Sequence, residues 1–321
     1  MRAFHVMSTA PERTYYQRTG GRRFSLEDFE ILVMVLSALK WRQHNGTIKL
    51  YTDAAGADYL ERSGLSFLWD AGVDTSTLEN STLDTSFDVF WASARTVALD
   101  VELAPCVMLD TDLVVWRDIR PLVRAPFMAL HREDFDGWTY VAKEKLHTPP
   151  GYVWDHWDWA VNPTNAALMY FGDDDHRKYC AQEGLKFLHG NFLEGEEKSQ
   201  THAVLVEQRL YPMCASKLEV PTEFFLWDHE GRQLADGNVN DTFTHLWVYK
   251  QTLMKEAQER QRICLRMTRR ILRDFPAMRA TLAAIPSVAP YVQEELNGGS
   301  VAVSHLADRF RRNSGRLESA P

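Results

Sequence analysis

Two carboxylates stand one residue apart in the stretch 106–116, which reads CVMLDTDLVVW. Apolar residues lead up to Asp110, and further apolar residues follow Asp112. Burying ionised carboxylates costs free energy unless they are paired or bind a metal ion. Carboxylate oxygens suit Mg²⁺ or Mn²⁺, ions that proteins usually share with substrate phosphates. The stretch therefore predicts a site for one divalent cation, and the alternative is that the two carboxylates only cap a turn.

A third ligand for this cation is expected from the stretch FTHLWVY, a largely apolar run in which His245 is the only histidine. A buried histidine needs a polar partner, and a neutral imidazole suits Mn²⁺ better than Mg²⁺. We therefore predict that Asp110, Asp112 and His245 hold Mn²⁺ or Mg²⁺. The rival interpretation makes His245 a hydrogen-bonded core residue.

The elements that must position these residues alternate between strand and helix. Strands are predicted at 3–7, 47–53 and 106–110, and helices at 25–41, 57–62 and 90–103, with Ser25 as the N-cap of the first helix. Such alternation predicts an α/β fold with a mainly parallel sheet, whose ligands gather beyond the carboxyl ends of the strands. Asp53, Asp110 and Asp112 all stand at such ends.

Composition limits the class of protein. The 321 residues are 45% hydrophobic and 25% charged, which is ordinary globular composition, and the net charge of −8 implies no general affinity for nucleic acid. The start of the chain does not resemble a signal peptide, and no apolar run is long enough to span a bilayer. The four cysteines are widely spaced, with no CxxC motif, and are expected to be free, buried thiols. A cytoplasmic protein is expected.

Charge divides the chain into two predicted parts. Residues 251–321 contain 12 basic and 7 acidic residues, a net charge of +5, which leaves −13 for residues 1–250. We predict a catalytic or binding domain over 1–250 and a basic helical tail over 251–321. The arginines of the tail flank an apolar stripe and could contact an anionic membrane surface peripherally, or the tail could pack on the acidic body. These arginines are Arg260, Arg262, Arg266, Arg269, Arg270 and Arg273.

Several segments in order resemble GT-A-type glycosyltransferases. MLDTDLVVWRDIRPLV resembles their Asp-x-Asp segment, and IKLYTDAAGADYLERSGL resembles the second strand and helix of their nucleotide-binding half. NPTNAALMYF, VEQRLYP and THLWVYK resemble the acceptor-side strand, the helix beyond it and a closing His…Lys segment. The resemblance covers about residues 1–250 and implies a Rossmann-like mixed sheet flanked by helices. The closing His and Lys are spaced differently from those of glycogenin-like members, and the glycines of those members are missing.

The resemblance implies a metal-dependent glycosyltransferase that moves a sugar from a nucleoside-diphosphate sugar, with a UDP-sugar as the expected donor, to a glycan or another hydroxyl acceptor. A divalent ion and nearby basic side chains would neutralise the charge that develops on the departing diphosphate. Asp53 could bind the nucleoside or cap the helix that follows it. The residues expected to bind the donor are Ser8, Asp53, Arg95, Thr111 and Lys250.

The acceptor side is expected in the stretch 151–165, GYVWDHWDWAVNPTN, where Trp154, Trp157 and Trp159 alternate with polar residues. Aromatic faces stack on sugars while carboxylates bind hydroxyl groups, so we predict that this segment lines an acceptor cleft with at least one tryptophan exposed. The alternative is that two of the three anchor the core. An inverting reaction needs a general base, with Glu207, Asp158 and Asp155 as candidates. A retaining reaction needs none, and Asn165 or Gln208 could support the departing phosphate.

Two other functions fit parts of the sequence. Haloacid-dehalogenase-type phosphatases share the Asp-x-Asp pattern after an apolar strand, and the run GDDD at 172–175 could supply their later acidic pair. Against this, about a hundred residues precede Asp110, and the chain continues as an apolar strand after Asp112. A protein with the glycosyltransferase fold that binds a sugar or nucleotide without transferring it is the third possibility.

Overall fold

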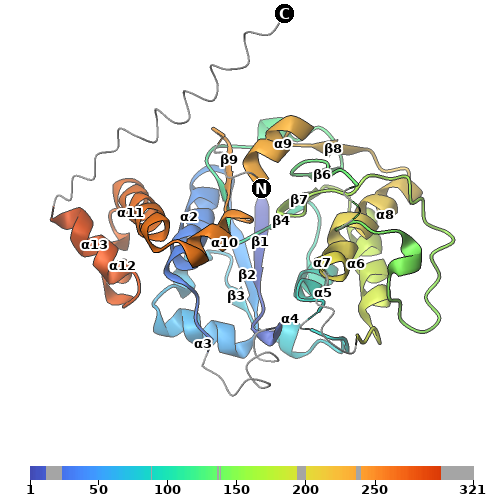
Figure 1. The fold of residues 1–321 in the computed structure, drawn as a ribbon, viewed down its shortest axis with the longest axis horizontal. Helices are drawn as coiled ribbons and strands as arrows, with labels where there is room; N and C mark the ends of the chain where they lie inside the picture. Colours follow the sequence, from blue (N-terminus) through green and yellow to red (C-terminus); the bar gives the residue numbers. More distant parts are fainter. Residues whose placement is uncertain are drawn as a thin grey trace, which may run out of the picture.

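The computed structural model describes residues 1–11, 24–87, 89–135, 137, 139–193, 200–235 and 240–297. At its centre lies a seven-stranded sheet in the order β3-β2-β1-β4-β7-β6-β8 (Figure 1). The chain contributes β1 (Arg2–Met7), β2 (Ile48–Thr52), β3 (Val73–Asp74), β4 (Cys106–Leu109), β6 (Phe127–Ala129), β7 (Leu168–Phe171) and β8 (Thr222–Phe224). Strands β3, β2, β1 and β4 are parallel, whereas β7 runs antiparallel to both β4 and β6. The predicted α/β class and mixed sheet are confirmed.

Side chains alternate between the two faces of this sheet, and each face has its own hydrophobic core. Ala3, Val107 and Leu109 belong to the core under α2 (Asp28–His44). Side chains of α3 (Ala54–Arg62) belong to the same core. Phe4 and Met108 belong to the core on the opposite face. That core is formed with α5 (Ser93–Val101), α6 (Asp174–Leu188), the π-helical turn Leu205–Leu210 and α8 (Tyr211–Lys217). The fold is therefore a three-layer arrangement of helices, sheet and helices.

Helix α2 begins later than the sequence predicted. Its N-cap is Glu27 and not Ser25, because Glu30 reaches back to accept the backbone N–H of Glu27 at 3.0 Å and so forms the capping box. Helix α3 begins at Ala54 and not near residue 57, because Asp53 caps it by accepting the N–H of Gly56 at 3.0 Å. Both differences arise from side chains that satisfy the free amides of a first turn.

A second, two-stranded sheet extends the fold beyond β4. The chain turns after β4 into β5 (Leu113–Val115), which pairs antiparallel with β9 (Phe243–His245) in the register Leu113↔His245. Strand β9 follows α9 (Asp228–Ala235) and leads into α10 (Tyr249–Lys255). Segments about 130 residues apart in the sequence are thus adjacent where the Asp-x-Asp motif lies.

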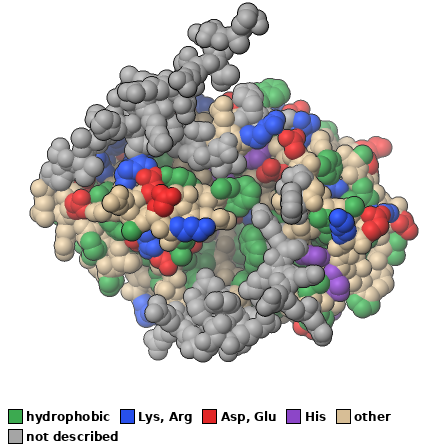
Figure 2. All heavy atoms as spheres, in the orientation of Figure 1, with side chains coloured by type: hydrophobic (Ala, Val, Ile, Leu, Met, Phe, Trp, Pro, Cys, Tyr) green, Lys and Arg blue, Asp and Glu red, His purple; other side chains and the backbone are tan. Residues whose placement is uncertain are grey.

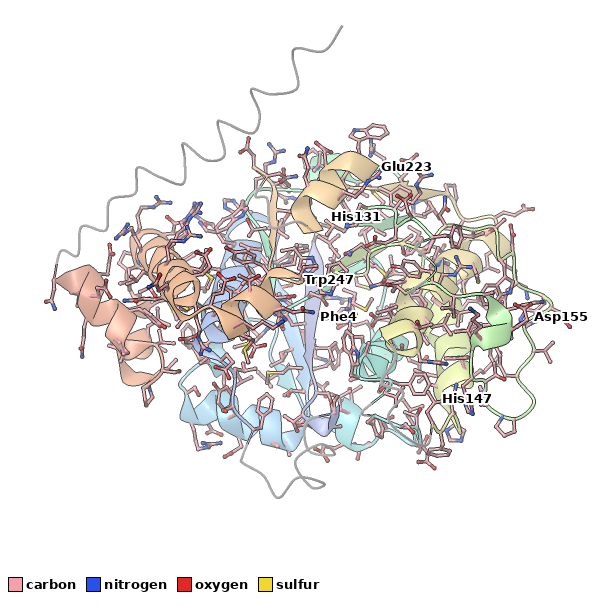
Figure 3. All side chains as sticks on the ribbon, viewed as in Figure 1. Phe4, His131, His147, Asp155, Glu223 and Trp247 are labelled. Carbon is pink, nitrogen blue, oxygen red and sulfur yellow. The ribbon has the colours of Figure 1, made fainter. Side chains whose placement is uncertain are left out.

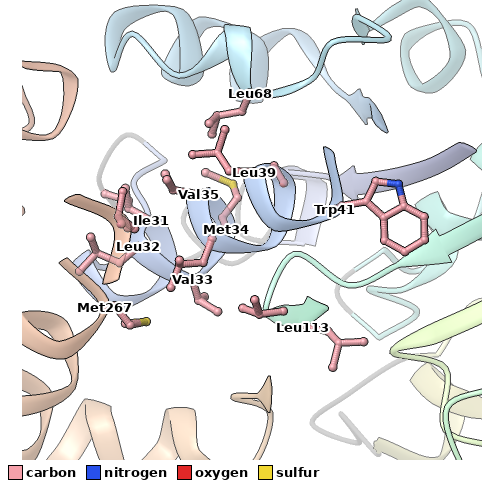
Figure 4. Packing of buried hydrophobic residues seen from close by; sticks show 14 of the residues in the cluster. Ile31, Leu32, Val33, Met34, Val35, Leu39, Trp41, Leu68, Leu113 and Met267 are labelled. Atoms are coloured by element: carbon pink, nitrogen blue, oxygen red, sulfur yellow. The ribbon is translucent and has the colours of Figure 1, made fainter. Parts of the chain in front are cut away.

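The helices after residue 256 pack on one another, and the first of them packs on α2. These helices are α11 (Ala257–Asp274), α12 (Met278–Ala284) and α13 (Ala289–Leu296) (Figure 1). Cys264 and Ile271 of α11 belong to the core under α2, as does Met267, which Figure 4 labels. Arg260 binds both Glu27 and Asp28 at the start of α2, at 2.5 and 2.7 Å. The tail residues 251–297 therefore pack on the body, one of the two arrangements considered.

Most of the tail arginines have acidic partners nearby. Arg262 pairs with Glu259, Arg269 with Glu295, and Arg270 and Arg273 with Asp274. These pairs neutralise much of the basic surface that would attract an anionic membrane. Peripheral membrane contact stays a prediction, as does a domain boundary near residue 250, and residues 298–321 lie outside the described part of the chain.

All four cysteines are buried and free. Among the described residues, no helix is both long enough and apolar enough to span a bilayer.

Candidate metal site

The β4–β5 turn holds the two carboxylates at the carboxyl end of the central parallel strands. The backbone N–H of Asp110 donates to Ala167 O at 2.8 Å, and the N–H of Leu113 donates to Asp110 O at 3.2 Å. On the other side, the N–H of Leu246 donates to Asp112 O at 3.2 Å. The turn is therefore held by β7 and by β9 together, which gives both carboxylates a fixed backbone.

The predicted third ligand lies beside them. Nε2 of His245 is 3.6 Å from Oδ1 of Asp112 and 4.0 Å from Oδ2 of Asp110, and one ligand atom from each residue lies within 4.8 Å of the others. Nε2 of His245 is buried and has no hydrogen-bond partner among the described residues. A buried ring nitrogen that faces two carboxylate oxygens fits a Mn²⁺ or Mg²⁺ ligand set better than a satisfied core histidine.

Each carboxylate also has a cation beside it. A guanidinium nitrogen of Arg95, from α5, is 2.6 Å from Asp110, and Nζ of Lys250, from α10, is 2.9 Å from Asp112. Burial acts to raise the pKa of Asp112, but Lys250 and His245 lower it well below its usual range. Burial raises the pKa of Asp110, which Arg95 only partly offsets. Arg95 and Lys250, which were predicted to bind the sugar-nucleotide donor, therefore lie in contact with the predicted metal ligands.

Glu207 is the third carboxylate of this cluster and lies deeper. Its side chain is 3% exposed, and Oε1 is 3.1 Å from Nε of Arg95. A terminal nitrogen of the same guanidinium, Nη2, donates to Ala166 O. Burial raises the pKa of Glu207 to about 8, and Arg95 offsets only part of that rise. With Glu207 protonated at neutral pH, the two positive charges of Arg95 and Lys250 balance the two negative charges of Asp110 and Asp112.

The raised pKa of Glu207 predicts a pH effect on stability. Between its ordinary pKa of 4.5 and about 8, native Glu207 keeps a proton that the unfolded chain has released, so stability is lost as the pH rises through this interval. Glu207→Gln removes this loss. The variant should gain stability over the parent by roughly 1.4 kcal/mol per pH unit across the interval. Urea unfolding of both proteins at pH 5 and pH 8 measures it, and a constant difference between them would contradict the prediction.

The remaining donor candidates lie on the neighbouring loops. Asp53 is buried and accepts hydrogen bonds from the backbone and hydroxyl of Thr9, at 2.6 and 2.9 Å, besides capping α3. Ser8 lies next to Thr9, with its hydroxyl 3.5 Å from Asp53, and Thr111 lies in the turn between the two metal-ligand candidates. The capping role considered for Asp53 is thus present. Nucleoside binding by Ser8, Asp53 and Thr111 stays a prediction.

The acceptor-side candidates do not lie together. Asn165 is buried just before β7, where its amide donates to Glu133 at 3.0 Å and its oxygen accepts the N–H of Ala167, the residue whose carbonyl accepts the N–H of Asp110. Asp158 is exposed and accepts the N–H of Ala160 at 2.9 Å. Gln208 accepts the hydroxyl of Tyr140. Asn165 is therefore connected to the carboxylate turn through Ala167, which bonds to both, whereas Asp158 belongs to a surface loop.

The tryptophan segment differs from the prediction. Trp157 is 5% exposed and belongs to the core, and Trp154 and Trp159 are half-buried against it, so none of the three is exposed. The expectation of at least one exposed tryptophan is wrong, because the rings pack on one another and on Phe187. Asp155 is exposed at the outer edge of the molecule, well away from Trp247 in Figure 3.

Trp247 is the exposed aromatic residue that sequence analysis missed. It is 38% exposed, and its ring lies nearly parallel to that of His245, at an interplanar angle of 16°. The sidechain lies near the middle of the face drawn in Figure 3, and Figure 2 shows hydrophobic side chains beside a hollow in the middle of that face. The signal in the sequence was a tryptophan two residues after the candidate ligand.

The acidic run expected for a phosphatase lies elsewhere. Asp173 caps α6, and Asp174 pairs with Arg177 and the N–H of Ala104. Because β7 is antiparallel to β4, with Leu109 opposite Leu168, the carboxyl ends of these two strands lie at opposite edges of the sheet. Asp110 and the run at 173–175 therefore cannot form one acidic site.

An α/β fold with a three-residue candidate metal site at the carboxyl edge of its parallel strands defines the class of this protein. The chain belongs to the family described as "Family of unknown function (DUF6734)", whose model matches residues 2–285. None of the curated proteins compared with the chain matches it.

Among solved structures, the fold is similar to that of mouse xyloside xylosyltransferase 1 in its apo form, at 12% identity and a TM-score of 0.34, over 70% of this chain and 84% of that one. It is similar to the galactosyltransferase LgtC in complex with donor and acceptor sugar analogues, at 11% identity and a TM-score of 0.34, over 76% and 86%. It is also similar to a protein described as a glucose-1-phosphate thymidylyltransferase from Bacillus anthracis, at 16% identity and a TM-score of 0.31, over 64% and 95%. These similarities concern the fold alone.

Proposed function

We propose that this protein is a metal-dependent glycosyltransferase that uses a nucleoside-diphosphate sugar, with a UDP-sugar as the first donor to test. The observation that carries the proposal is the proximity of the half-buried Asp110 to the buried Asp112 and His245, with Arg95 and Lys250 against the carboxylates. Such a set offers both a place for a divalent cation and two positive charges for a diphosphate. A non-catalytic nucleotide-binding protein would bind the cation and the diphosphate in the same way but would not transfer a sugar.

The residues present fit Mn²⁺ or Mg²⁺. Asp110 and Asp112 would supply carboxylate oxygens, and the unpartnered Nε2 of His245 would supply an imidazole nitrogen, which favours Mn²⁺. A bound divalent ion would act as a Lewis acid that stabilises the negative charge on the departing diphosphate. The backbone hydrogen bonds from β7 and β9 hold these ligands in place before any substrate arrives.

The chain's own cations would do the rest of the electrostatic work. Lys250 is about one-third exposed and flexible enough to turn from Asp112 toward a phosphate oxygen. Arg95 is buried between Asp110 and Glu207, so it would keep its place and its charge. In this proposal Glu207 holds Arg95. If Glu207 or Asp158 is also the general base, or if Asn165 supports the departing phosphate, its amide or alanine variant loses transfer activity.

Two measurements on the full chain test the proposal. Isothermal titration with UDP, with and without Mn²⁺, should show binding that depends on the metal ion. Incubation with UDP-sugars and a panel of saccharides should then yield a glycosylated product. Metal-dependent UDP binding, with neither transfer of the sugar to any acceptor nor hydrolysis of the UDP-sugar, would favour the non-catalytic alternative. Release of phosphate from small phosphate esters, with no UDP binding, would favour a phosphatase.

Trp247 is expected to contact the sugar part of a bound substrate, because it is the exposed aromatic ring beside the candidate ligand His245. Trp247→Ala should raise the KM for the acceptor or donor sugar about threefold to tenfold, the usual worth of an aromatic stacking contact. Affinity for UDP and Mn²⁺ should change less than twofold. Phe67→Ala, which removes a ring that is 51% exposed, serves as the control and should change neither quantity. Equal effects of the two variants would contradict the prediction.

A further inference from the structure

A chain of buried hydrogen bonds lies under the turn that carries Asp110 and Asp112. Nε1 of Trp69 donates to Nδ1 of His5 at 3.2 Å, and Nε2 of His5 is 3.1 Å from the hydroxyl of Ser37. The hydroxyl of Ser37 donates to Leu113 O at 2.6 Å and is 3.5 Å from Asp110 O. This series of hydrogen bonds begins at Trp69, just after the short helix Ser66–Leu68. It passes through His5 of β1 and Ser37 of α2 and reaches both ends of the turn.

The direction of each bond in this chain is set. Trp69 can only donate, so Nδ1 of His5 must accept and Nε2 must carry the proton that goes to Ser37. Ser37 then has its own proton left for the carbonyl of Leu113. Burial also lowers the pKa of His5 to about 3, so the ring stays neutral. Each polar group is used, which is what makes their complete burial tolerable.

Ser37 lies in the middle of a helix that is buried along most of its length. Apart from Asp28 and Lys40 near its ends, the other buried positions of α2 are apolar, as the side chains labelled around Leu113 in Figure 4 show. A buried hydroxyl in such a helix could serve stability alone. Ser37, however, does not bond to its own helix: it reaches across to the carbonyl groups of Leu113 and Asp110, the two residues that bracket the Asp-x-Asp turn.

We infer that Ser37, His5 and Trp69 are positioning residues that hold the Asp110–Leu113 turn in the shape needed to bind the divalent cation. The inference rests on the proposed metal site and goes beyond it, because none of the three residues can reach a substrate from the core. Outer partners that orient metal ligands typically change metal affinity 10-fold to 100-fold when they are removed.

The test compares Ser37→Ala with Val35→Ala in the full-length protein. Val35 is buried on the same helix, and two residues along a helix is a rotation of about 200°, so it lies on the side away from Leu113 (Figure 4). Both variants lose packing or bonds in the same core, and their melting temperatures show how similar the losses are. His5→Phe breaks the chain one step earlier and should act in the same direction, but more weakly.

Two readouts are measured on each variant. In hydrogen exchange without metal ion, Ser37→Ala should speed exchange of the peptide covering 110–113 about tenfold more than Val35→Ala does. In Mn²⁺ titration, it should weaken affinity about tenfold, against less than twofold for the control. Equal changes in both variants would reduce the chain to a stabilising role and overturn the inference. If the parent protein binds no Mn²⁺, the metal site is wrong, and the exchange measurement still decides whether the chain holds the turn.

Discussion

Asp112→Asn should abolish metal-dependent nucleotide binding, with a loss of UDP affinity in Mn²⁺ of about 100-fold or more. Asp112 is buried, its pKa is held well below the usual range by Lys250 and His245, and it is therefore ionised at any working pH. The amide removes that charge and leaves the ammonium of Lys250 without its partner at 2.9 Å. Isothermal titration with UDP and Mn²⁺ measures the loss.

Asp175→Asn provides the matched control, because Asp175 is an exposed carboxylate in the first turn of α6, beyond the far end of β7. It changes the net charge by the same amount and should leave UDP affinity within twofold. The variant at 112 must also keep a native circular dichroism spectrum. UDP binding to Asp112→Asn as tightly as to the parent, with Mn²⁺ present, would remove Asp112 from the metal site.

Lys250→Gln should change two affinities in opposite directions. In the metal-free protein, Lys250 neutralises Asp112 and so competes with a cation for the same oxygens. Its removal should strengthen the binding of Mn²⁺ alone by about tenfold, since a positive charge a few ångströms away opposes a second one. Its removal should also weaken UDP binding in saturating Mn²⁺ by about tenfold, because the diphosphate loses a cationic partner.

The opposite signs are what distinguish this role from simple damage to the site. A variant that only distorted the site would lose affinity for Mn²⁺ and for UDP together. Lys255→Gln, an exposed lysine at the end of the same helix α10, changes the same charge and should move neither affinity by more than twofold. If Lys250→Gln weakens both affinities, Lys250 supports the shape of the site and does not compete for Asp112.

Local patterns in the sequence were enough for much of the fold. The alternation of strand and helix predicted β1, β2, β4, α2, α3 and α5, because period and turn residues are properties of a short segment. The same patterns placed Asp110 and Asp112 at the end of a buried strand. Helix starts were predicted less well: Ser25 was expected to cap α2, but Glu27 and Glu30 do so. Several residues compete for a cap within one turn, and small differences decide between them.

Burial of the tryptophans could not be predicted from their spacing. Aromatic residues alternating with carboxylates fit a sugar cleft and a packed loop equally well, and the choice depends on what lies against them. Here Phe187 and Tyr179, from α6, cover the segment. Trp247 was overlooked although it stands two residues after the candidate ligand His245, because this spacing does not show whether the ring is exposed.

The sequence alone determined that two carboxylates end a buried strand and need a partner, because that follows from the residues within one segment. The tertiary structure decided which side chains lie next to these carboxylates. The antiparallel pairing of β5 with β9 places His245 opposite Leu113, and the packing of α5 and α10 on the turn places Arg95 and Lys250 against Asp110 and Asp112. The pairing of β7 with β4 likewise sends the acidic run at 173–175 to the other edge. Contacts between distant segments depend on strand order and direction, which no single segment contains.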